Sequence, residues 1–125
     1  MRYTLLLHYP EATAETIGQE AIEEGMRAFA SYAATLQSAG VLVSGEVLQP
    51  SEVATTLRLV DGSVQVQDGP FADTKEQLGG TFVIDVPDLD AAIEWGRQAP
   101  AIGWGAVEVR PGATHVVDGV WTPNA

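Results

Sequence analysis

Apolar and polar residues alternate along the first ten positions of the chain. Every second residue from Tyr3 to Tyr9 is a leucine or a tyrosine, which predicts a strand that is buried on at least one face. From about Thr16 to Ala39 the apolar residues recur instead at steps of three and four, which predicts a helix with one buried stripe. Thr16 with Gln19 resembles a capping box at the start of this helix, and Gly40 suits the left-handed position that closes it.

A hairpin is the clearest local signal in the middle of the chain. Apolar residues alternate with polar ones on both sides of Asp61-Gly62, a dipeptide that favours a two-residue type I′ turn. Because such a turn sets the register of its strands, it places Leu59 opposite Val64 and Thr55 opposite Asp68. Side chains alternate between the two faces, so Asp68 is predicted to point to the same apolar face as Val64.

The remaining pattern completes an α+β order. Further strands are expected near 41–48, 81–86 and 106–110, with one more near 114–117, and a second helix begins after Asp88 as its N-cap. Without the inserted hairpin, this is the ferredoxin-like plan of an antiparallel sheet with two helices on one face. The uncovered face carries apolar residues too, so we expect it to meet a partner, most simply a second copy in a symmetric homodimer.

Length and composition limit the class of protein. A chain of 125 residues suits a single domain spanning 1–125, large enough to fold without disulfides. There is no cysteine, which excludes a disulfide framework, a thiol nucleophile and a thiolate zinc site. The apolar run that ends at His8 is too short for a signal peptide or a membrane span. We therefore expect a cytoplasmic protein with no membrane association.

Charge limits the partners further. Seventeen acidic and six basic residues give a formal net charge of −11. Proteins that bind nucleic acid directly neutralise phosphates with clustered lysines and arginines. The basic residues here are scattered singly along the chain, so direct nucleic-acid binding is not expected.

The segment after the hairpin holds the most unusual chemistry. A carboxylate at the end of an apolar face is costly unless it is paired or hydrogen-bonded. Asp68 is therefore either the cap of the turn that follows, accepting backbone N–H bonds, or a pocket carboxylate that acts as an acid, base or ligand anchor. In the polar loop beyond it, Lys75 is expected to contact a carboxylate, and 74–78 could form one helical turn. Gly79-Gly80 precedes a strand, so it indicates a bulge or a close backbone approach rather than a phosphate loop.

Other candidate groups are isolated. His8, near the end of the first strand, is the best-placed base, because a neutral imidazole is available near pH 7. Glu46, between Gly45 and Val47, either faces a pocket or is the polar half of an alternation. His115 lies far from His8 in sequence, and two such histidines do not predict a metal site. No dinucleotide, phosphate-loop or nucleophile-elbow motif is present, so no cofactor or metal is expected.

A longer run resembles a known family. The residues from Asp68 to Gly80 read DGPFADTKEQLGG, which looks like the signature of the DGPF (DGPFAETKE) branch of the YCII-related family. The resemblance continues through GEVLQP at 45–50, ATTLR at 54–58, VPDLDAAIEW at 86–95 and VEVRP at 107–111. It implies a dimeric ferredoxin-like α/β barrel.

The resemblance implies less about activity. Better-defined YCII relatives resemble small-molecule enzymes with a His–Asp dyad, including a dehydrochlorinase that acts on a chlorinated aromatic compound. The corresponding positions here hold Phe29 and Ala99, so the dyad mechanism does not carry over. Genes of this branch often lie beside extracytoplasmic-function sigma factors, which implies a regulatory association rather than a mechanism.

Two hypotheses follow. In the first, a cofactor-independent enzyme binds a small organic molecule between sheet and helices and catalyses elimination or isomerisation. Asp68 would then be the acid, base or anchor, with His8 and Glu46 as auxiliaries. In the second, the chain is a non-catalytic ligand-binding or interaction module linked to sigma-factor regulation.

Overall fold

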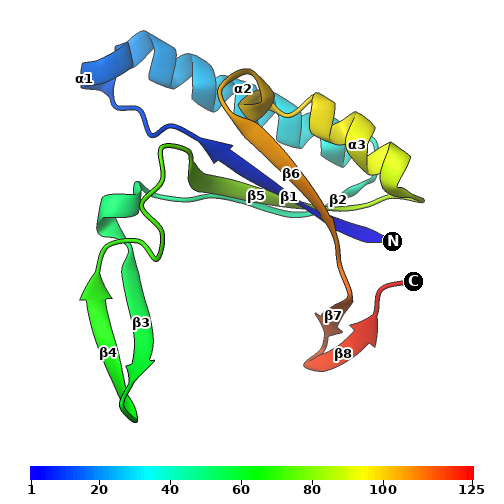
Figure 1. The fold of residues 1–125 in the computed structure, drawn as a ribbon. Coiled ribbons are helices and arrows are strands. Elements are labelled where there is room, and N and C mark those ends of the chain that lie inside the picture. The colour runs from blue at the N-terminus through cyan, green and yellow to red at the C-terminus, as the bar shows by residue number, and fades with distance from the viewer.

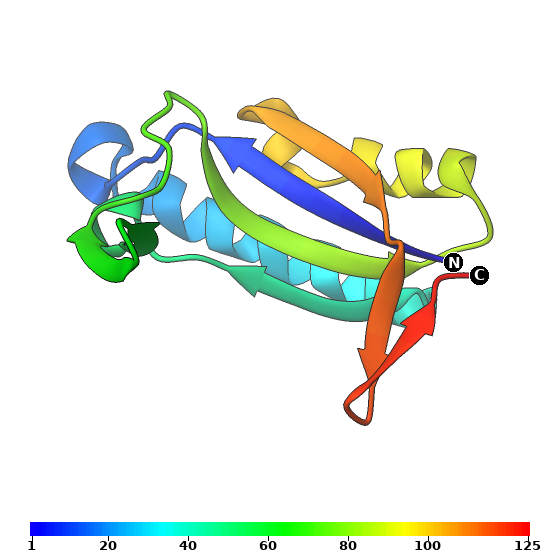
Figure 2. The ribbon, with the colours of Figure 1, turned by 60° about the horizontal axis from the view of Figure 1, so that its bottom comes forward.

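A four-stranded antiparallel sheet, in the order β2-β5-β1-β6, forms the centre of the molecule, and the computed structural model describes all 125 residues (Figure 1). Helices α2 and α3 cover one face of the sheet, with the short helix α1 beyond one end (Figures 1 and 2). This α+β arrangement is compatible with a ferredoxin-like fold. No helix is long and apolar enough to cross a membrane.

The sheet strands are β1 (Arg2–Tyr9), β2 (Leu42–Val47), β5 (Gln77–Asp85) and β6 (Ala106–Pro111). The helices are α1 (Ala14–Ile17), α2 (Gln19–Ser38) and α3 (Leu89–Arg97), with 3-10 turns η1 (Ser51–Val53) and η2 (Pro100–Gly103).

Two separate hairpins project from the face of the sheet that the helices leave open (Figure 1). The first consists of β3 (Thr55–Val60) and β4 (Ser63–Asp68), and the second of β7 (Thr114–Val117) and β8 (Val120–Pro123). They descend from opposite ends of the sheet, with the open sheet face between them (Figures 1 and 2). The molecule therefore has one packed side and one side with two arms.

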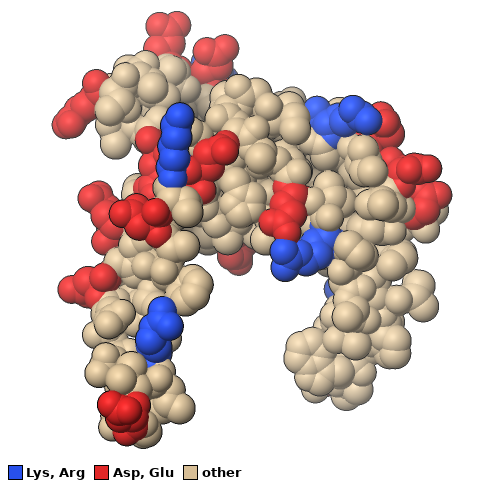
Figure 3. Space-filling view, in the orientation of Figure 1, with Lys and Arg blue, Asp and Glu red and all other residues tan.

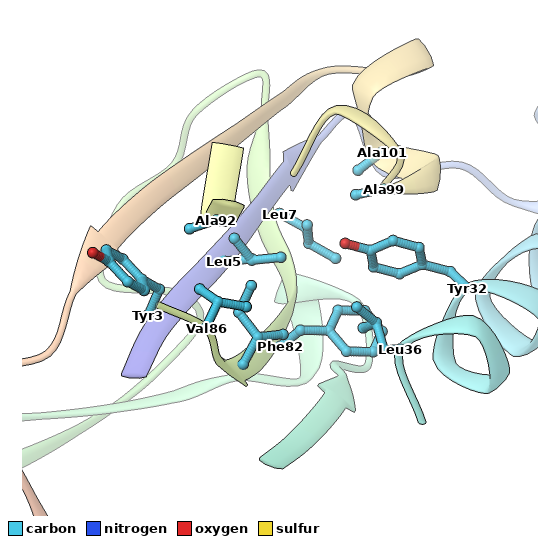
Figure 4. Close-up of a cluster of buried hydrophobic side chains, with 11 residues drawn as sticks. Tyr3, Leu5, Leu7, Tyr32, Leu36, Phe82, Val86, Ala92, Ala99 and Ala101 are labelled. Atoms are coloured by element: carbon cyan, nitrogen blue, oxygen red, sulfur yellow. The ribbon is translucent and has the colours of Figure 1, made fainter. Parts of the chain in front are cut away.

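The hydrophobic core lies between the sheet and the helices (Figure 4). The alternation along β1 sends Tyr3, Leu5 and Leu7 to the helix side, where they are buried, while their neighbours stay partly exposed. Helix α2 contributes Leu36 and Tyr32, whose hydroxyl donates to the Trp95 carbonyl at 2.7 Å. Burial raises the pKa of Tyr32 to about 12. Only 13 of the 125 residues are buried, so this core accounts for a small part of the apolar sequence.

The predicted helix over 16–39 is divided in two by Gly18, whose φ of 90° interrupts the helical backbone. The capping box joins Thr13 and Thr16 rather than Thr16 and Gln19. The predicted close is confirmed, since Gly40 has φ 74° and donates to the Gln37 carbonyl at 3.0 Å. The first turn is therefore a separate unit, and the long apolar helix begins only after it.

The hairpin prediction is confirmed residue by residue. Leu59 pairs with Val64 and Thr55 with Asp68. Asp61 and Gly62 both have positive φ, 49° and 81°, as a type I′ turn requires. The turn alone was enough to set this register.

One prediction for the second half needs correction. The segment 74–78 forms no helical turn, because Gln77 and Leu78 already belong to β5 and pair with Tyr9 and His8. Gly79 is the extra residue of a bulge at this point, as expected for the glycine pair. A side chain there would collide with the ring of Tyr9.

The tail forms more structure than the sequence predicted. The expected strand near 114–117 is β7, and it pairs with β8, which was not predicted. The turn between them is Asp118-Gly119, with φ 49° and 79°. It has the same sequence and the same backbone as the turn at Asp61-Gly62.

Candidate functional site

A hollow of about 1310 Å³ lies where the open sheet face meets the signature segment. His8 at the end of β1 forms one side of it. The η1 region, residues 48–51 and 53–56, forms the second side, and residues 70–72 and 74–78 form the third. About half of the lining residues are polar, but most of the lining surface is apolar. One wall is the segment that distinguishes this sequence from an ordinary α+β domain.

His8 is the sequence-predicted candidate that the fold brings to this hollow. Its side chain is 30% exposed, and its Nε2 lies 3.4 Å from Oε1 of Glu108 on the neighbouring strand β6. Arg110 binds the other oxygen of the same carboxylate. The hydrogen bond from Arg110, with the charges of Arg110 and His8, holds the pKa of Glu108 below its ordinary value. Glu108 is thus an acidic neighbour of the imidazole, bound by Arg110.

Glu46 and Asp68 lie elsewhere. Glu46 pairs with Thr81 on the sheet edge and is exposed on the open face, outside the hollow. Asp68 lies on the apolar face of the hairpin, as predicted, but it is exposed and outside the hollow. The three candidates therefore do not converge in a single chain.

The turn after Asp68 is held by other groups. The carboxylate of Asp68 accepts no hydrogen bond, so the turn-capping interpretation is wrong. Instead the Gly69 N–H donates to the Ala54 carbonyl at 2.8 Å, and the Thr56 hydroxyl donates to the Gly69 carbonyl at 2.8 Å. Because Asp68 is exposed, it also carries no burial cost in the single chain.

The signature loop is tied together by its own side chains. The Gln77 amide donates to the carbonyls of Ala72 and Thr74, both at 3.1 Å, and the Thr74 hydroxyl donates to the Glu76 carbonyl at 2.7 Å. Lys75 lines the hollow and forms no ion pair, so the expected carboxylate contact is absent. The loop thus has a defined shape, with a cationic side chain free to meet a ligand. Figure 3, in the orientation of Figure 1, shows that this acidic molecule exposes few basic side chains.

A second, more apolar pocket of about 650 Å³ lies on the helix side, between α2, the segment after β1 and Trp104. Behind it, Tyr9, Phe29 and Trp104 form an aromatic cluster with ring centroids 5.8 to 6.4 Å apart. Burial, with the nearby charge of Glu11, raises the pKa of Tyr9. This cluster is held in place by packing rather than by charge.

The two positions that correspond to the relatives' dyad belong to this packed side. The ring of Phe29 stacks on Phe82 at 6.4 Å, and Ala99 is 1% exposed within the core. Neither side chain can transfer a proton. The structure also has no group of three or more His, Cys, Asp or Glu side chains placed to hold a metal ion.

Fold and site together define a small α+β domain with an open sheet face and a hollow beside a patterned loop. The YCII-related domain family matches residues 1–113, and the chain belongs to this family. It is also 36% identical over 117 residues to an uncharacterized protein of Rhizobium meliloti (strain 1021), which covers 92% of this chain and 94% of that protein. The relative shares nearly the whole domain, and no activity is assigned to it by its name.

Sequence reasoning missed Glu108 as the partner of His8. The two residues lie on strands that pair across about a hundred positions of sequence, and no tight turn sets the register between those strands. The one available signal was the alternation of 106–110, which puts Glu108 on the same side of its strand as Ala106, the residue opposite His8.

Proposed function

We propose that this YCII-related domain binds a small organic molecule in the hollow beside the signature loop, with His8 as the proton-transfer group. The observation that carries the proposal is the position of His8, which lines the hollow while its Nε2 faces the ionised Glu108 at 3.4 Å. No other histidine lines the hollow. His8, rather than Asp68, thus has the central role.

The arrangement supports acid–base chemistry without a cofactor. When Nε2–H donates to Glu108, Nδ1 is left with its lone pair and can accept a proton from a bound molecule. Lys75 supplies a positive charge in the same hollow, which would stabilise negative charge that develops after proton removal. Elimination and isomerisation need only one or two such groups, so they are the reaction classes that we propose.

We also propose that the working unit is a homodimer, closed as a dimeric α/β barrel. The chain exposes 8334 Å², whereas a folded monomer of 13.2 kDa exposes about 6,400 Å². The excess is about 1,900 Å² per chain, or about 3,800 Å² for two chains. This value lies within the total of about 2,000–5,000 Å² that an obligate homodimer interface buries over both subunits. The open sheet face, flanked by two projecting hairpins, is the surface available for this contact (Figure 2).

A thermal-shift screen of small organic acids and aromatic metabolites tests the ligand proposal. We expect at least one compound to stabilise the wild type and to lose most of its effect in His8→Gln. The matched control is His115→Gln, since His115 lies in β7 outside the hollow. A ligand that stabilises His8→Gln and the wild type equally would remove His8 from the binding site.

The second candidate is a non-catalytic ligand-binding module. It is favoured by the absence of Glu46 and Asp68 from the hollow and by the apolar residues Phe29 and Ala99 at the dyad positions. The two candidates differ in what happens to a bound compound. Mass spectrometry of the ligand after long incubation with wild type and with His8→Gln separates them, because only an enzyme converts the ligand in a His8-dependent way.

A further inference from the structure

The β3–β4 hairpin has an apolar face that nothing in the chain covers. Four side chains point to this face, and each is about two-thirds exposed. They are Leu57 at 66%, Leu59 at 69%, Val64 at 64% and Val66 at 67%. A two-stranded hairpin alone in water is marginally stable at best. This arm therefore needs a partner surface to keep its shape.

The β7–β8 hairpin is the same kind of arm at the other end of the sheet (Figure 1). Its apolar side chains are also exposed, namely Val116 at 48%, Val117 at 46%, Val120 at 65% and Trp121 at 69%. Trp121 and Val116 pair across the two strands and share one face. An exposed tryptophan is among the most frequent anchors of protein interfaces.

We propose that in the homodimer the β7–β8 hairpin of one subunit packs on the β3–β4 hairpin of the other, and that Trp121 of the partner subunit closes the hollow beside His8. This inference rests on the homodimer of the proposed function and makes each site a product of two chains. Thr55 and Thr56 of β3 already line the hollow. An arm that packs against β3 would therefore lie at its open side.

Symmetry allows two ways for the arms to meet. A two-fold axis between the facing sheets and across the strands exchanges the two ends, so unlike hairpins meet; an axis along the strands brings like hairpins together. In the second arrangement, Asp61 and Asp68 of one β3–β4 hairpin would face the same carboxylates of the other, and facing like charges are destabilising. The strands of β7–β8 carry no carboxylate outside the turn residue Asp118. The pairing of unlike arms is therefore favoured.

A tryptophan in this place defines a ligand class. The rim of the hollow already presents Phe71, which is 77% exposed and lies under Arg58 at 5.2 Å from its ring centroid. Trp121 of the partner subunit would add an aromatic wall to this rim, with His8 and Lys75 at the polar end. The site then suits a flat organic molecule with an apolar ring and an anionic group.

Cysteine cross-linking tests the pairing, and the chain offers a clean background because it has no cysteine. The double variant Ala72→Cys/Val116→Cys keeps both Phe71 and Trp121 and places one thiol on the loop and one on the tryptophan face. With a short bismaleimide reagent, we expect this variant to give a covalent dimer on a denaturing gel. The single variants and Ala72→Cys/Met26→Cys, whose second thiol lies on the helix side, should remain monomeric on the gel.

Each outcome decides the matter. A covalent dimer from either single variant would show that like hairpins meet, which would overturn the proposal. If Ala72→Cys/Val116→Cys gives no covalent dimer, the proposal is overturned as well. Sedimentation of the wild type separates this failure from that of the proposed function. A dimeric wild type without the cross-link removes only the arm pairing, whereas a monomeric wild type removes the homodimer as well.

A second measurement does not depend on new thiols. Trp121→Ser should raise the dimer dissociation constant by at least tenfold, whereas Met26→Ser, which removes an equally exposed apolar side chain from the helix side, should leave it unchanged. Equal dissociation constants for the two variants would overturn the role of Trp121.

Discussion

The helix side and the open side of the molecule carry similar apolar residues but bury them to opposite degrees. On the helix side, Leu5, Leu7 and Ile84 are completely buried. On the open side, Leu57 and Leu59 of the β3–β4 hairpin are about two-thirds exposed. Both sides nevertheless come from strands in which apolar and polar residues alternate. The difference lies in what covers each side. Helices α2 and α3 cover one side, and nothing in the chain covers the other (Figure 1).

This contrast separates the apolar residues that form the core from those that do not. A single chain uses about eleven residues to build its core, and that core holds the sheet on which His8 sits. The remaining apolar residues are too many and too exposed to serve this purpose. The packed side therefore accounts for folding, and the exposed apolar area on the open side is what the proposed association would bury.

The largest effect is expected from the packed side. Leu36→Ala removes a side chain that is 0% exposed, and the lost contacts and the cavity together should lower the free energy of unfolding by about 2–5 kcal/mol. Urea denaturation measures this change. Met26→Ala on the same helix is the control, because an exposed side chain should change stability by less than about 0.5 kcal/mol. Similar losses in both variants would contradict the division into a packed and an open side.

A smaller loss is expected where the packed side touches the site. Gly105 follows η2, and a Cβ added there would lie 2.0 Å from the His8 carbonyl oxygen and 2.9 Å from Cα of Tyr9. Because these are backbone atoms, the end of β1 must shift, and we expect Gly105→Ala to cost roughly 1–3 kcal/mol.

The control for this variant is Gly103→Ala, since nothing lies within 4 Å of its added Cβ. It should be neutral or slightly stabilising, by up to about 1 kcal/mol. The imidazole resonances of His8 provide the second readout, and they should move in Gly105→Ala alone. If they stay in place while stability falls, η2 supports the core but does not position the site.

The sequence predicted those parts of the fold in which neighbours in the chain are neighbours in space. The register from Thr55 to Asp68 followed from one turn, and the face of Asp68 followed from the register. The close of α2 at Gly40 is equally local. By contrast, the single helical turn that 74–78 could form is absent, because β5 is extended by pairing with the end of β1, a contact between distant segments.

The candidate site was less predictable for the same reason. His8 was identified from its strand position and its chemistry, but its partner Glu108 depends on the β1–β6 register, which only the folded sheet determines. Asp68 is exposed and needs neither a turn bond nor a pocket, which the strand register alone does not reveal. The β7–β8 hairpin was foreseeable, since its Asp-Gly turn repeats the signal that located the first hairpin.

On the open side, the prediction is an effect on assembly without an effect on the fold of the subunit. Leu59 is 69% exposed in the single chain, so Leu59→Ser should leave the far-ultraviolet spectrum unchanged. Burying a leucine in an interface is worth about 1.5–3 kcal/mol, so the dimer dissociation constant should rise by about tenfold or more. Sedimentation equilibrium measures it. Gln65→Ser, on the opposite face of the same hairpin, is the control and should dissociate like the wild type. Loss of secondary structure in Leu59→Ser would mean that the arm supports the subunit itself.

The smallest effect concerns the end of the sheet beside the β7–β8 hairpin, where an ion pair joins the chain's first residue to β5. The Met1 ammonium donates to Asp85 at 2.7 Å, and this hydrogen bond, with the charge of the ammonium, lowers the pKa of Asp85 from its ordinary 3.8. A lowered pKa in the folded state adds stability above pH 3.8, and this contribution is lost as the pH falls through the lowered value. The Asp85 side chain is 57% exposed, so Asp85→Asn should cost less than about 1 kcal/mol at neutral pH.

The difference from the wild type should vanish in strong acid, whereas Asp73→Asn, which removes an exposed carboxylate without an ion pair, should show no such dependence. A difference for Asp85→Asn that persists unchanged at the lowest pH would assign the effect to packing rather than to charge.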